Sequence, residues 1–229
     1  MPKLQYLSHS CFKVETGGRT LLIDPFITGN PKARVKASDL NPDYILLSHG
    51  HGDHLGDGID IAKRTGATII APNELAVYCQ NKGAKAHPMH IGGAWNFDFG
   101  RVKLTIAHHG SAAGPGPNGW EYTGNPCGFL IMSDGKTLYH SGDTGIFYDM
   151  KLIGEMHPVD LALLPIGDNF TMGVEDAIKA VELLRPKRVV PMHYNTFDLI
   201  KADPEKFAAG ARKHGAEVTV LGIGDSMSY

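Results

Sequence analysis

The segment Tyr44–His54 places four potential metal ligands directly after an apolar run, and this restricts the folds open to the chain. The run Tyr44–Leu47 has the composition of a buried strand that emerges at a sheet edge. It continues into Ser48-His49-Gly50-His51-Gly52-Asp53-His54. Imidazoles and carboxylates bind zinc and similar divalent metals, and Gly50 and Gly52 allow the tight turn that would aim them at one ion. The sequence therefore predicts a metal site at a sheet edge. A solvated histidine-rich loop is the alternative, which the number of ligand types disfavours.

Apolar runs of strand length recur along the whole chain, most of them bounded by Gly, Pro, Asn or Asp. They cover residues 4–7, 11–14, 20–23, 44–47, 68–70, 102–107, 128–132, 137–139, 161–164, 188–190 and 217–221. Apolar spacing and N-terminal capping signals predict helices over 59–64, 74–80, 150–155, 174–184 and from 204 through 211. A meander of strands followed by alternating strands and helices predicts sheets sandwiched between helices. Because no repeat or linker is visible, we expect one domain over residues 1–229.

The composition is that of an ordinary globular protein and argues against several classes of partner. The 229 residues are 42% hydrophobic and 20% charged, with a formal net charge of −2. This charge gives no electrostatic case for nucleic acid or an anionic membrane, and no apolar run approaches the roughly 18 residues of a membrane-spanning helix. The first residues contain no apolar signal segment, and the three cysteines are widely spaced, as reduced thiols are. We therefore expect a cytoplasmic protein without a nucleic-acid or membrane partner.

Three further positions carry a ligand-type residue just after an apolar strand. They are the pair His108-His109, Asp143 and His193. In open α/β sheets, sites gather beyond the carboxyl ends of the strands, so these side chains are expected to converge on the first cluster. Alone, Asp143 would be interpreted as a turn residue and His193 as a core histidine; together with the cluster they favour a metal site. Neighbours on a strand point to opposite faces, so only one of His108 and His109 is expected to be a ligand.

Other residues near these strand ends have less certain roles. Asp24 ends a predicted strand and is expected to accept a hydrogen bond from a ligand imidazole or a backbone N–H. His140, Tyr194 and Asn195 lie beside candidate ligands in the sequence, where hydrogen bonding at the site and a purely structural role are equally compatible with the pattern. The Gly- and Pro-rich segment 110–124 is expected to be irregular, either a lid over the site or a surface loop.

These motifs resemble those of the metallo-β-lactamase superfamily. The resemblance rests on His49-x-His51-x-Asp53-His54, Asp24, Ser141-Gly142-Asp143-Thr144 and His193. The segments 7–12 (LSHSCF), 23–26 (IDPF), 165–167 (PIG) and 191–197 (PMHYNTF) are similar to an uncharacterised family of bacterial and archaeal metal-dependent hydrolases related to the L-ascorbate-6-phosphate lactonases. The resemblance spans nearly the whole chain and implies an αββα sandwich. It does not specify the substrate, because many chemistries share this fold.

The resemblance also implies two metal ions. His49, His51 and one histidine of the 108–109 pair would hold the first ion, and Asp53, His54 and His193 the second, with Asp143 bridging both. We assign His109, because the family's ligand usually precedes a small Ser or Gly, here Gly110. The ions are expected to be zinc, although such ligands also accept Mn or Fe. His9 belongs to a recurrent N-terminal motif of such proteins, and strand packing and access to the site are both open for it.

Two metals sharing a water would lower its pKa from about 15.7 towards about 7, giving hydroxide that attacks an ester, lactone, amide or phosphodiester. Asp53 and Asp24 are the carboxylates assigned to catalytic work: Asp53 orients the nucleophile and carries a proton to the leaving group, with Asp24 behind the ligands. The leading hypothesis is therefore a hydrolase of a small substrate. Exposed sheet edges and a lid would be compatible with a homo-oligomer.

Four alternatives compete with this hypothesis. An antibiotic-degrading lactamase is disfavoured because no signal segment is visible. A nuclease on this fold is disfavoured by the net charge and the absence of a basic arm. A di-iron redox protein is disfavoured because such relatives typically carry Glu in place of His51 and a fused flavin domain. A degenerate, non-catalytic scaffold is disfavoured because every ligand position is filled.

Overall fold

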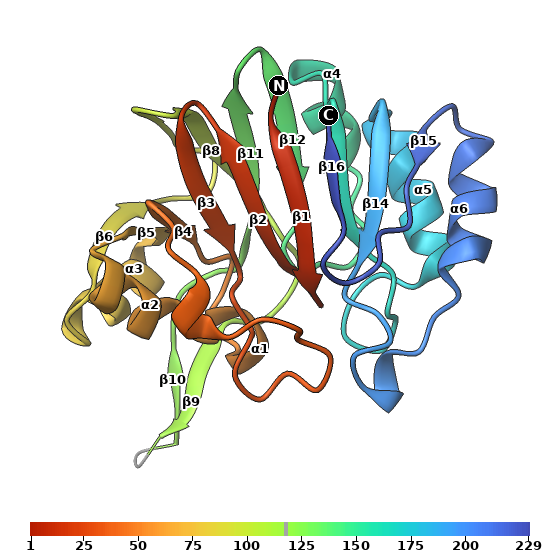
Figure 1. Cartoon of the computed structure of the whole chain (residues 1–229). Coiled ribbons are helices and arrows are strands. Elements are labelled where there is room, and N and C mark those ends of the chain that lie inside the picture. Colours follow the sequence, from red (N-terminus) through yellow and green to blue (C-terminus); the bar gives the residue numbers. More distant parts are fainter. Residues whose placement is uncertain (117–118) are drawn as a thin grey trace.

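The computed structural model describes residues 1–116 and 119–229, which form two seven-stranded sheets packed face to face with helices on both outer sides (Figure 1). This confirms the αββα sandwich. The first sheet has the order β16-β1-β2-β3-β4-β5-β6 and the second β15-β14-β13-β12-β11-β8-β7, and β9 and β10 form a separate hairpin.

The strands and helices have the following bounds. The first sheet contains β1 (Lys3–Ser8), β2 (Cys11–Thr16), β3 (Arg19–Ile23), β4 (Tyr44–Leu46), β5 (Thr68–Pro72), β6 (Lys85–Met89) and β16 (Ser226–Ser228). The second contains β7 (Ala94–Phe97), β8 (Gly100–Ile106), β11 (Cys127–Ser133), β12 (Lys136–His140), β13 (Leu161–Pro165), β14 (Arg188–Met192) and β15 (Glu217–Val218). The hairpin strands are β9 (Ala112–Gly116) and β10 (Gly119–Tyr122). The helices are α1 (Gly52–Leu55), α2 (Gly58–Thr65), α3 (Asn73–Asn81), α4 (Met150–Met156), α5 (Val174–Leu184) and α6 (Pro204–Arg212), with 3₁₀ turns η1 (Ala37–Asp39) and η2 (Asp198–Ile200).

Three apolar layers hold this arrangement together. Between the sheets, fully buried side chains of the first sheet such as Phe12 meet side chains of the second such as Phe129, each contributing roughly 1.5–3 kcal/mol by burial. A second layer lies between the first sheet and helices α2 and α3, and a third between the second sheet and helices α4, α5 and α6. Within the described residues, the helices are too short and too polar to cross a bilayer.

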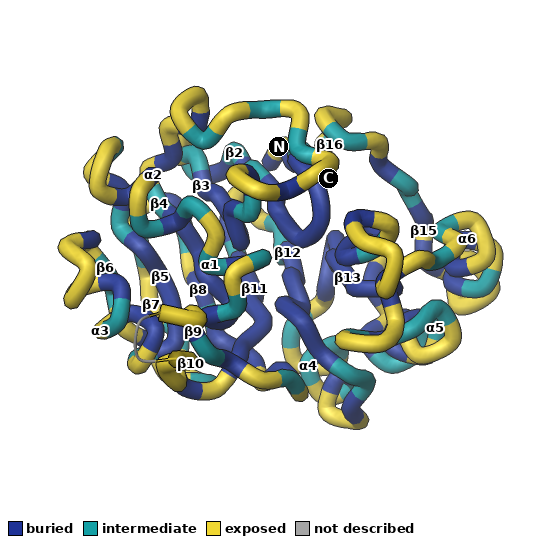
Figure 2. The backbone as a smooth tube through the Cα atoms, turned by 90° about the horizontal axis from the view of Figure 1, so that it is seen from below, coloured by how far each residue is buried: buried dark blue, intermediate teal, exposed yellow. Residues whose placement is uncertain are grey.

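Strand direction explains where a site can form. Strands β3 to β6 are parallel, and β1 runs with them because two antiparallel steps, β1 to β2 and β2 to β3, separate it from β3. In the second sheet β12 to β15 are parallel, and β8 runs with them through two antiparallel steps via β11. The loops that follow these strands gather at the edge where α1 lies, which Figure 2 views from below.

All the predicted strands and helices are present, although the last expected strand ends at Val218 rather than 221. The sequence missed the short helix α1, which it treated as a turn, and the strands β6, β7 and β16, which lie at the edges of their sheets and have few buried side chains. The expectation of an irregular segment over 110–124 was wrong, since β9 and β10 pair as an antiparallel hairpin; residues 117–118 of that segment lie outside the described residues. An exposed two-stranded ribbon buries few side chains, so its sequence need not alternate between apolar and polar residues.

Candidate metal centre

The candidate ligands all follow the carboxyl end of a strand. His49 and His51 come after β4, and the short helix α1 presents Asp53 and His54. The loops after β8, β12 and β14 supply His109, Asp143 and His193. Their ligand atoms form three overlapping groups in which all atoms lie within 4.8 Å of one another: His49, His51 and His109; His49, His54 and Asp143; and His9, Asp53, His54 and His193.

The first ligand group consists of His49, His51 and His109. The His49 Nε2 and His51 Nδ1 atoms are 3.0 Å apart, and the His109 ring centroid lies 5.1 Å from each of the other two. Burial lowers the pKa of all three imidazoles. They are therefore neutral at physiological pH, which is the form that binds a metal.

His109 and not its neighbour His108 reaches this group. His108 is exposed, and its ring stacks on Phe147 with centroids 5.0 Å apart. The alternation of side chains after β8 thus separates the two histidines as the sequence predicted, and His109 is the one turned inward.

The second ligand group consists of Asp53, His54 and His193. The Oδ2 atom of Asp53 lies 3.8 Å from His193 Nε2 and 3.9 Å from His54 Nε2. Asp143 lies between the two groups: its Oδ2 is 3.1 Å from both His54 Nε2 and His193 Nε2, and 3.8 Å from His109 Nε2. One carboxylate therefore contacts both sides of the cluster.

The geometry fits divalent cations. Two nitrogen or oxygen ligands at 2.0–2.1 Å from a tetrahedral ion lie roughly 3.3 Å apart, and the closest contacts within the cluster are 3.0–3.9 Å. His54 Nε2 and Asp143 Oδ1 are buried and have no hydrogen-bond partner among the described residues, although His54 Nε2 is 3.1 Å from Asp143 Oδ2. The His54 imidazole and the Asp143 carboxylate therefore lie close together without the geometry of a hydrogen bond. Because buried polar atoms are normally bonded, a cation between them accounts for both.

The charges around His54 also favour a cation. Burial alone would lower the pKa of His54, but Asp143, Asp53 and Asp24 outweigh it and hold that pKa well above its usual value. Conversely, burial opposes ionisation of Asp143, while His193 and His54 hold its pKa well below its usual range. Ligation requires His54 to lose its proton, so a metal and a proton compete for this nitrogen.

Asp24 lies behind His54, as the sequence predicted. Its Oδ2 atom is 2.9 Å from His54 Nδ1 and accepts a hydrogen bond from the Ser48 hydroxyl at 2.6 Å. Its Oδ1 atom accepts the Ser48 N–H at 2.8 Å. The residue is fully buried and has a left-handed backbone, with φ of 43°. Asp24 therefore fixes both the ring of His54 and the start of the histidine-rich turn.

His9, whose role the sequence left open, reaches the site. It lies in the turn between β1 and β2, is fully buried, and its Nε2 atom is 3.2 Å from Asp53 Oδ2. Its Nδ1 atom is 2.9 Å from the Thr196 hydroxyl, and its ring centroid is 4.0 Å from that of His193. Burial lowers the pKa of His9 to about 4. The strand-end test that identified the other candidates also applies here, because His9 follows the carboxyl end of β1.

The base of the β9–β10 hairpin holds the histidine-rich turn. The Ser111 hydroxyl accepts the Gly50 N–H at 3.1 Å and lies 2.7 Å from the Thr123 hydroxyl. A Cβ atom at position 50 would stand 2.2 Å from Thr123 Oγ1, so only glycine fits this turn without displacement. The segment 110–124 thus supports the turn between His49 and His51 from its base.

His140, Tyr194 and Asn195 have structural contacts. The Nε2–H of His140 donates to the Ser10 carbonyl at 3.0 Å, and its Nδ1 accepts the Gly142 N–H at 3.1 Å. The Asn195 side chain bonds both backbone groups of Ala202 at 3.0 and 3.1 Å. Tyr194 packs against the core beneath α5 and α6. These residues shape the loops that carry the candidate ligands.

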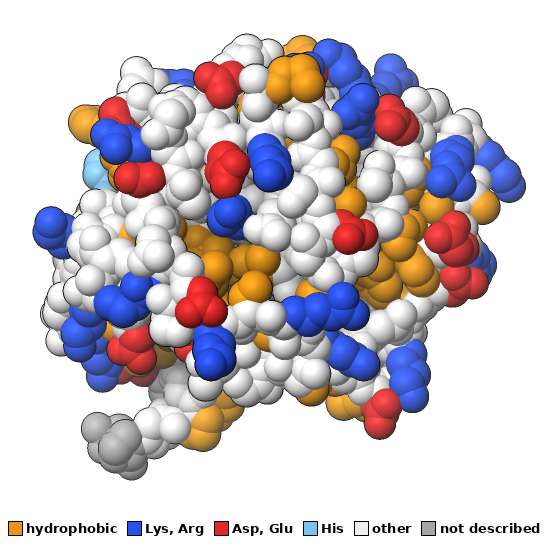
Figure 3. Space-filling model, in the orientation of Figure 1, with side chains coloured by type: hydrophobic (Ala, Val, Ile, Leu, Met, Phe, Trp, Pro, Cys, Tyr) orange, Lys and Arg blue, Asp and Glu red, His pale blue; other side chains and the backbone are white. Residues whose placement is uncertain are grey.

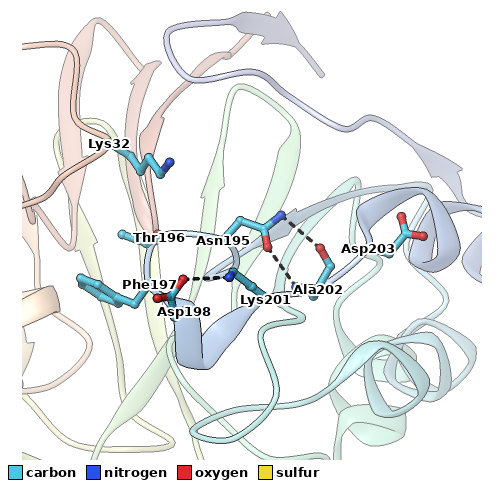
Figure 4. A pocket seen from close by; sticks show the side chains of 8 residues that line it. All are labelled: Lys32, Asn195, Thr196, Phe197, Asp198, Lys201, Ala202 and Asp203. Atoms are coloured by element: carbon cyan, nitrogen blue, oxygen red, sulfur yellow. Dashed lines mark hydrogen bonds and ion pairs between the residues drawn. The ribbon is translucent and has the colours of Figure 1, made fainter.

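A cavity of about 570 Å³ lies along the loop that follows His193 (Figure 4). It is lined by Lys32, Asn195, Thr196, Phe197, Asp198, Lys201, Ala202 and Asp203. Thr196 connects the cavity wall to His9, and the Phe197 ring centroid is 5.7 Å from that of His9. The cavity therefore lies next to residues that contact His9, and the residues that line it do not include the candidate ligands.

Comparison with known proteins decides the family. Residues 3–193 match the family model described as a beta-lactamase superfamily domain. A protein of Pelotomaculum thermopropionicum named UPF0173 metal-dependent hydrolase is 54% identical over 226 residues, which is 98% of this chain and 99% of that protein. The chain belongs to this family of metal-dependent hydrolases.

Other members of the family and one solved structure agree. The UPF0173 metal-dependent hydrolase of Carboxydothermus hydrogenoformans is 54% identical over 223 residues, 97% of this chain and 98% of the relative. The structure of Igni18, a metallo hydrolase from the archaeon Ignicoccus hospitalis, matches with a TM-score of 0.89 and 39% identity over 100% of this chain and 99% of Igni18. The chain is thus a metal-dependent hydrolase of the metallo-β-lactamase superfamily.

Proposed function

We propose that this enzyme binds two divalent metal ions and hydrolyses an ester, lactone or phosphodiester in a small substrate. The observation that carries the proposal is the position of Asp143, whose Oδ2 atom is 3.1 Å from His54 and His193 and 3.8 Å from His109. His49, His51 and His109 would hold one ion and Asp53, His54 and His193 the other, with Asp143 shared. Zinc is the first choice for this ligand set, and Mn or Fe would also fit it.

The chemistry of the reaction divides between the ions and Asp53. When bound, two divalent ions lower the pKa of a shared water from about 15.7 towards about 7 and polarise the substrate oxygen. Asp53 is the more accessible carboxylate, with 33% of its side chain exposed against 3% for Asp143. It would accept a proton from the attacking water while the new bond to the carbonyl carbon or phosphorus forms. It would then return that proton to the leaving oxygen as the old bond breaks.

The mixed surface charge supports a small-molecule substrate, and the free cysteines support a cytoplasmic location. Basic and acidic side chains are interspersed on the face drawn in Figure 3, and the net charge is −2, so this face offers no continuous basic track for a nucleic acid. The cavity of about 570 Å³ beside Thr196 and Phe197 suits a ligand of modest size. Cys11, Cys79 and Cys127 are free and buried, as is common in a reducing compartment.

Metal analysis tests the two-ion proposal. Protein purified without chelator should contain close to two metal equivalents per chain, and His51→Ala should lose one of them together with turnover. His214→Ala, a histidine substitution in the turn after α6, is the matched control and should keep both. A content near zero or one in the unsubstituted protein would contradict the proposal.

A substrate panel tests the reaction. Chromogenic lactones, esters and phosphodiesters should be offered to protein loaded separately with Zn and Mn. We expect turnover of at least one class, lost in His51→Ala and kept in His214→Ala. Metal-loaded protein that turns over none of the three classes would contradict the proposed reaction.

A further inference from the structure

His9 is a buried histidine beside the candidate ligands for which the proposed reaction has no task. Its side chain is fully buried, its ring packs 4.0 Å from that of His193, and its two nitrogens each have one partner. We infer that His9, held in one tautomer by Thr196, is a positioning residue that orients the Asp53 carboxylate at the metal centre. This inference rests on the proposed function.

The partners of His9 determine where its proton lies. A carboxylate only accepts hydrogen bonds, so the contact of 3.2 Å with Asp53 Oδ2 requires a hydrogen on Nε2. A neutral imidazole then has an acceptor at Nδ1, to which the Thr196 hydroxyl donates at 2.9 Å. Thr196 thereby selects the tautomer that donates to Asp53, as outer partners of metal ligands commonly do.

The alternative is that His9 itself binds the second ion, since its Nε2 lies in the group with Asp53, His54 and His193. The orientation of the rings argues against it. The N–H of His9 is aligned with the Asp53 oxygen in a hydrogen bond, whereas His54 Nε2 approaches Asp143 at 3.1 Å without forming one. A nitrogen that carries a hydrogen towards a carboxylate has no lone pair free for a metal, so His9 acts on Asp53 instead.

The Asp53 carboxylate needs a hydrogen-bond partner such as His9, because the short helix α1 does little to restrain its side chain. Helix α1 has four residues, and the Asp53 side chain is one-third exposed. Among the described residues, His9 makes the hydrogen bond to its carboxylate; His54 and His193 lie at 3.9 and 3.8 Å. A freely rotating carboxylate would lose side-chain conformational entropy each time it bound the ion or the nucleophile.

The backbone of His9 is itself fixed. Its carbonyl accepts the His193 N–H at 3.0 Å and the Tyr6 hydroxyl at 3.3 Å. These bonds hold a left-handed backbone, with φ of 59°, that is unfavourable for a non-glycine residue. The turn places the ring against both Asp53 and His193.

Paired substitutions test the inference on the full chain. His9→Leu removes the donor, whereas His9→Gln keeps an N–H near the position of Nε2. Thr196→Val removes the hydroxyl at nearly constant shape, and Thr196→Ser keeps it. Thr16→Val is the matched control, because Thr16 is a buried threonine whose hydroxyl bonds Ser133 away from the metal centre.

The readouts are metal affinity by chelator competition and the absorption spectrum of the Co(II)-loaded protein, with kcat and KM measured on any substrate found. We expect His9→Leu to bind two ions at saturating metal but to hold one of them about 10–100-fold more weakly. Its Co(II) spectrum and kcat should change, while His9→Gln restores most of the affinity. Thr196→Val should show a smaller loss that Thr196→Ser removes, and Thr16→Val should show none.

Three results would overturn the inference. Loss of a whole metal equivalent in His9→Leu at saturating metal would make His9 a ligand. Unchanged affinity and Co(II) spectrum in His9→Leu would leave Asp53 independent of it. If His9→Leu does not fold, equal affinities of Thr196→Val and Thr196→Ser would contradict the tautomer assignment. The metal content of the unsubstituted protein is measured in the same series, so failure of the two-ion proposal is distinguished from failure of this inference.

Discussion

The second ligand group is supported by a carboxylate and an imidazole behind it, whereas the first group is supported by serine hydroxyls that contact one ligand ring and the backbone of the turn. Asp24 bonds the ring of His54 at 2.9 Å, and His9 contacts the carboxylate of Asp53 at 3.2 Å. In the first group, the Ser48 hydroxyl lies 2.9 Å from His49 Nδ1, and the Ser111 hydroxyl accepts the Gly50 N–H between His49 and His51. The two halves of one centre therefore depend on different kinds of contact.

The support of the second group coincides with backbone strain. His9, Asp24 and His193 all have positive φ, at 59°, 43° and 53°. Such conformations cost roughly 1–3 kcal/mol each and persist where surrounding contacts over-determine them. The turn of the first group instead contains Gly50, where the nearby Thr123 side chain leaves no space for a Cβ atom and the backbone is not strained. We expect substitutions of outer partners to affect the second ion more than the first.

Asp143→Asn should have the largest effect and should not distinguish the two groups. The substitution keeps the shape but removes the charge that contacts His54, His193 and His109. We expect loss of metal from both sites and turnover reduced to background, with metal content and activity as the measurements. Asp160→Asn is the matched control, since Asp160 is a buried aspartate bonded by Lys136 and Lys187. Retention of one full equivalent in Asp143→Asn would mean that the carboxylate is not shared.

Asp24→Asn should come next and should affect the second ion more than the first, because Asp24 bonds the His54 ring directly and reaches the His49 ring only through the Ser48 hydroxyl. It weakens the bond to His54 Nδ1, and we expect the affinity for that ion to fall about 10–100-fold, as for other outer partners of metal ligands. Chelator competition resolves the two ions. Equal weakening of both ions would contradict the difference between the two groups, although Asp24 also bonds Ser48 at the start of the turn.

The sequence predicts the ligands because each one follows the carboxyl end of a parallel-running strand, and that rule depends only on local apolar runs. Strand alternation alone does not separate His108 from His109, because the inward face depends on where β8 ends, at Ile106; the family resemblance is needed to assign His109. The sequence leaves His9 open, because the left-handed turn that aims its ring at Asp53 is fixed by long-range bonds to His193 and Tyr6.

The segments missed in the fold have a similar explanation. Strand β6 contains Lys85 and Pro88 and forms the edge of its sheet, where few side chains are buried and the apolar pattern is weak. The contact of Ser111 and Thr123 with the histidine-rich turn joins residues about sixty to seventy positions apart, and neither has an apolar neighbour pattern that signals it. Local patterns identify what a strand end carries, whereas distant polar contacts determine how it is held.

Ser111→Ala should have the smallest effect and should be confined to the first ion. It leaves the buried Gly50 N–H without its acceptor, which costs about 1–3 kcal/mol of unfolding free energy, and it removes the partner of Thr123. Because the ligand rings of His49 and His51 are not bonded by Ser111 directly, we expect a loss in affinity of only a few-fold for the first ion. Urea unfolding and chelator competition measure the two quantities, with the exposed Ser38→Ala as the control. The contrary outcome is that Ser111→Ala lowers the affinity for the first ion as much as Asp24→Asn lowers it for the second. A backbone contact would then support a metal ligand as strongly as a side chain that bonds the ligand ring itself.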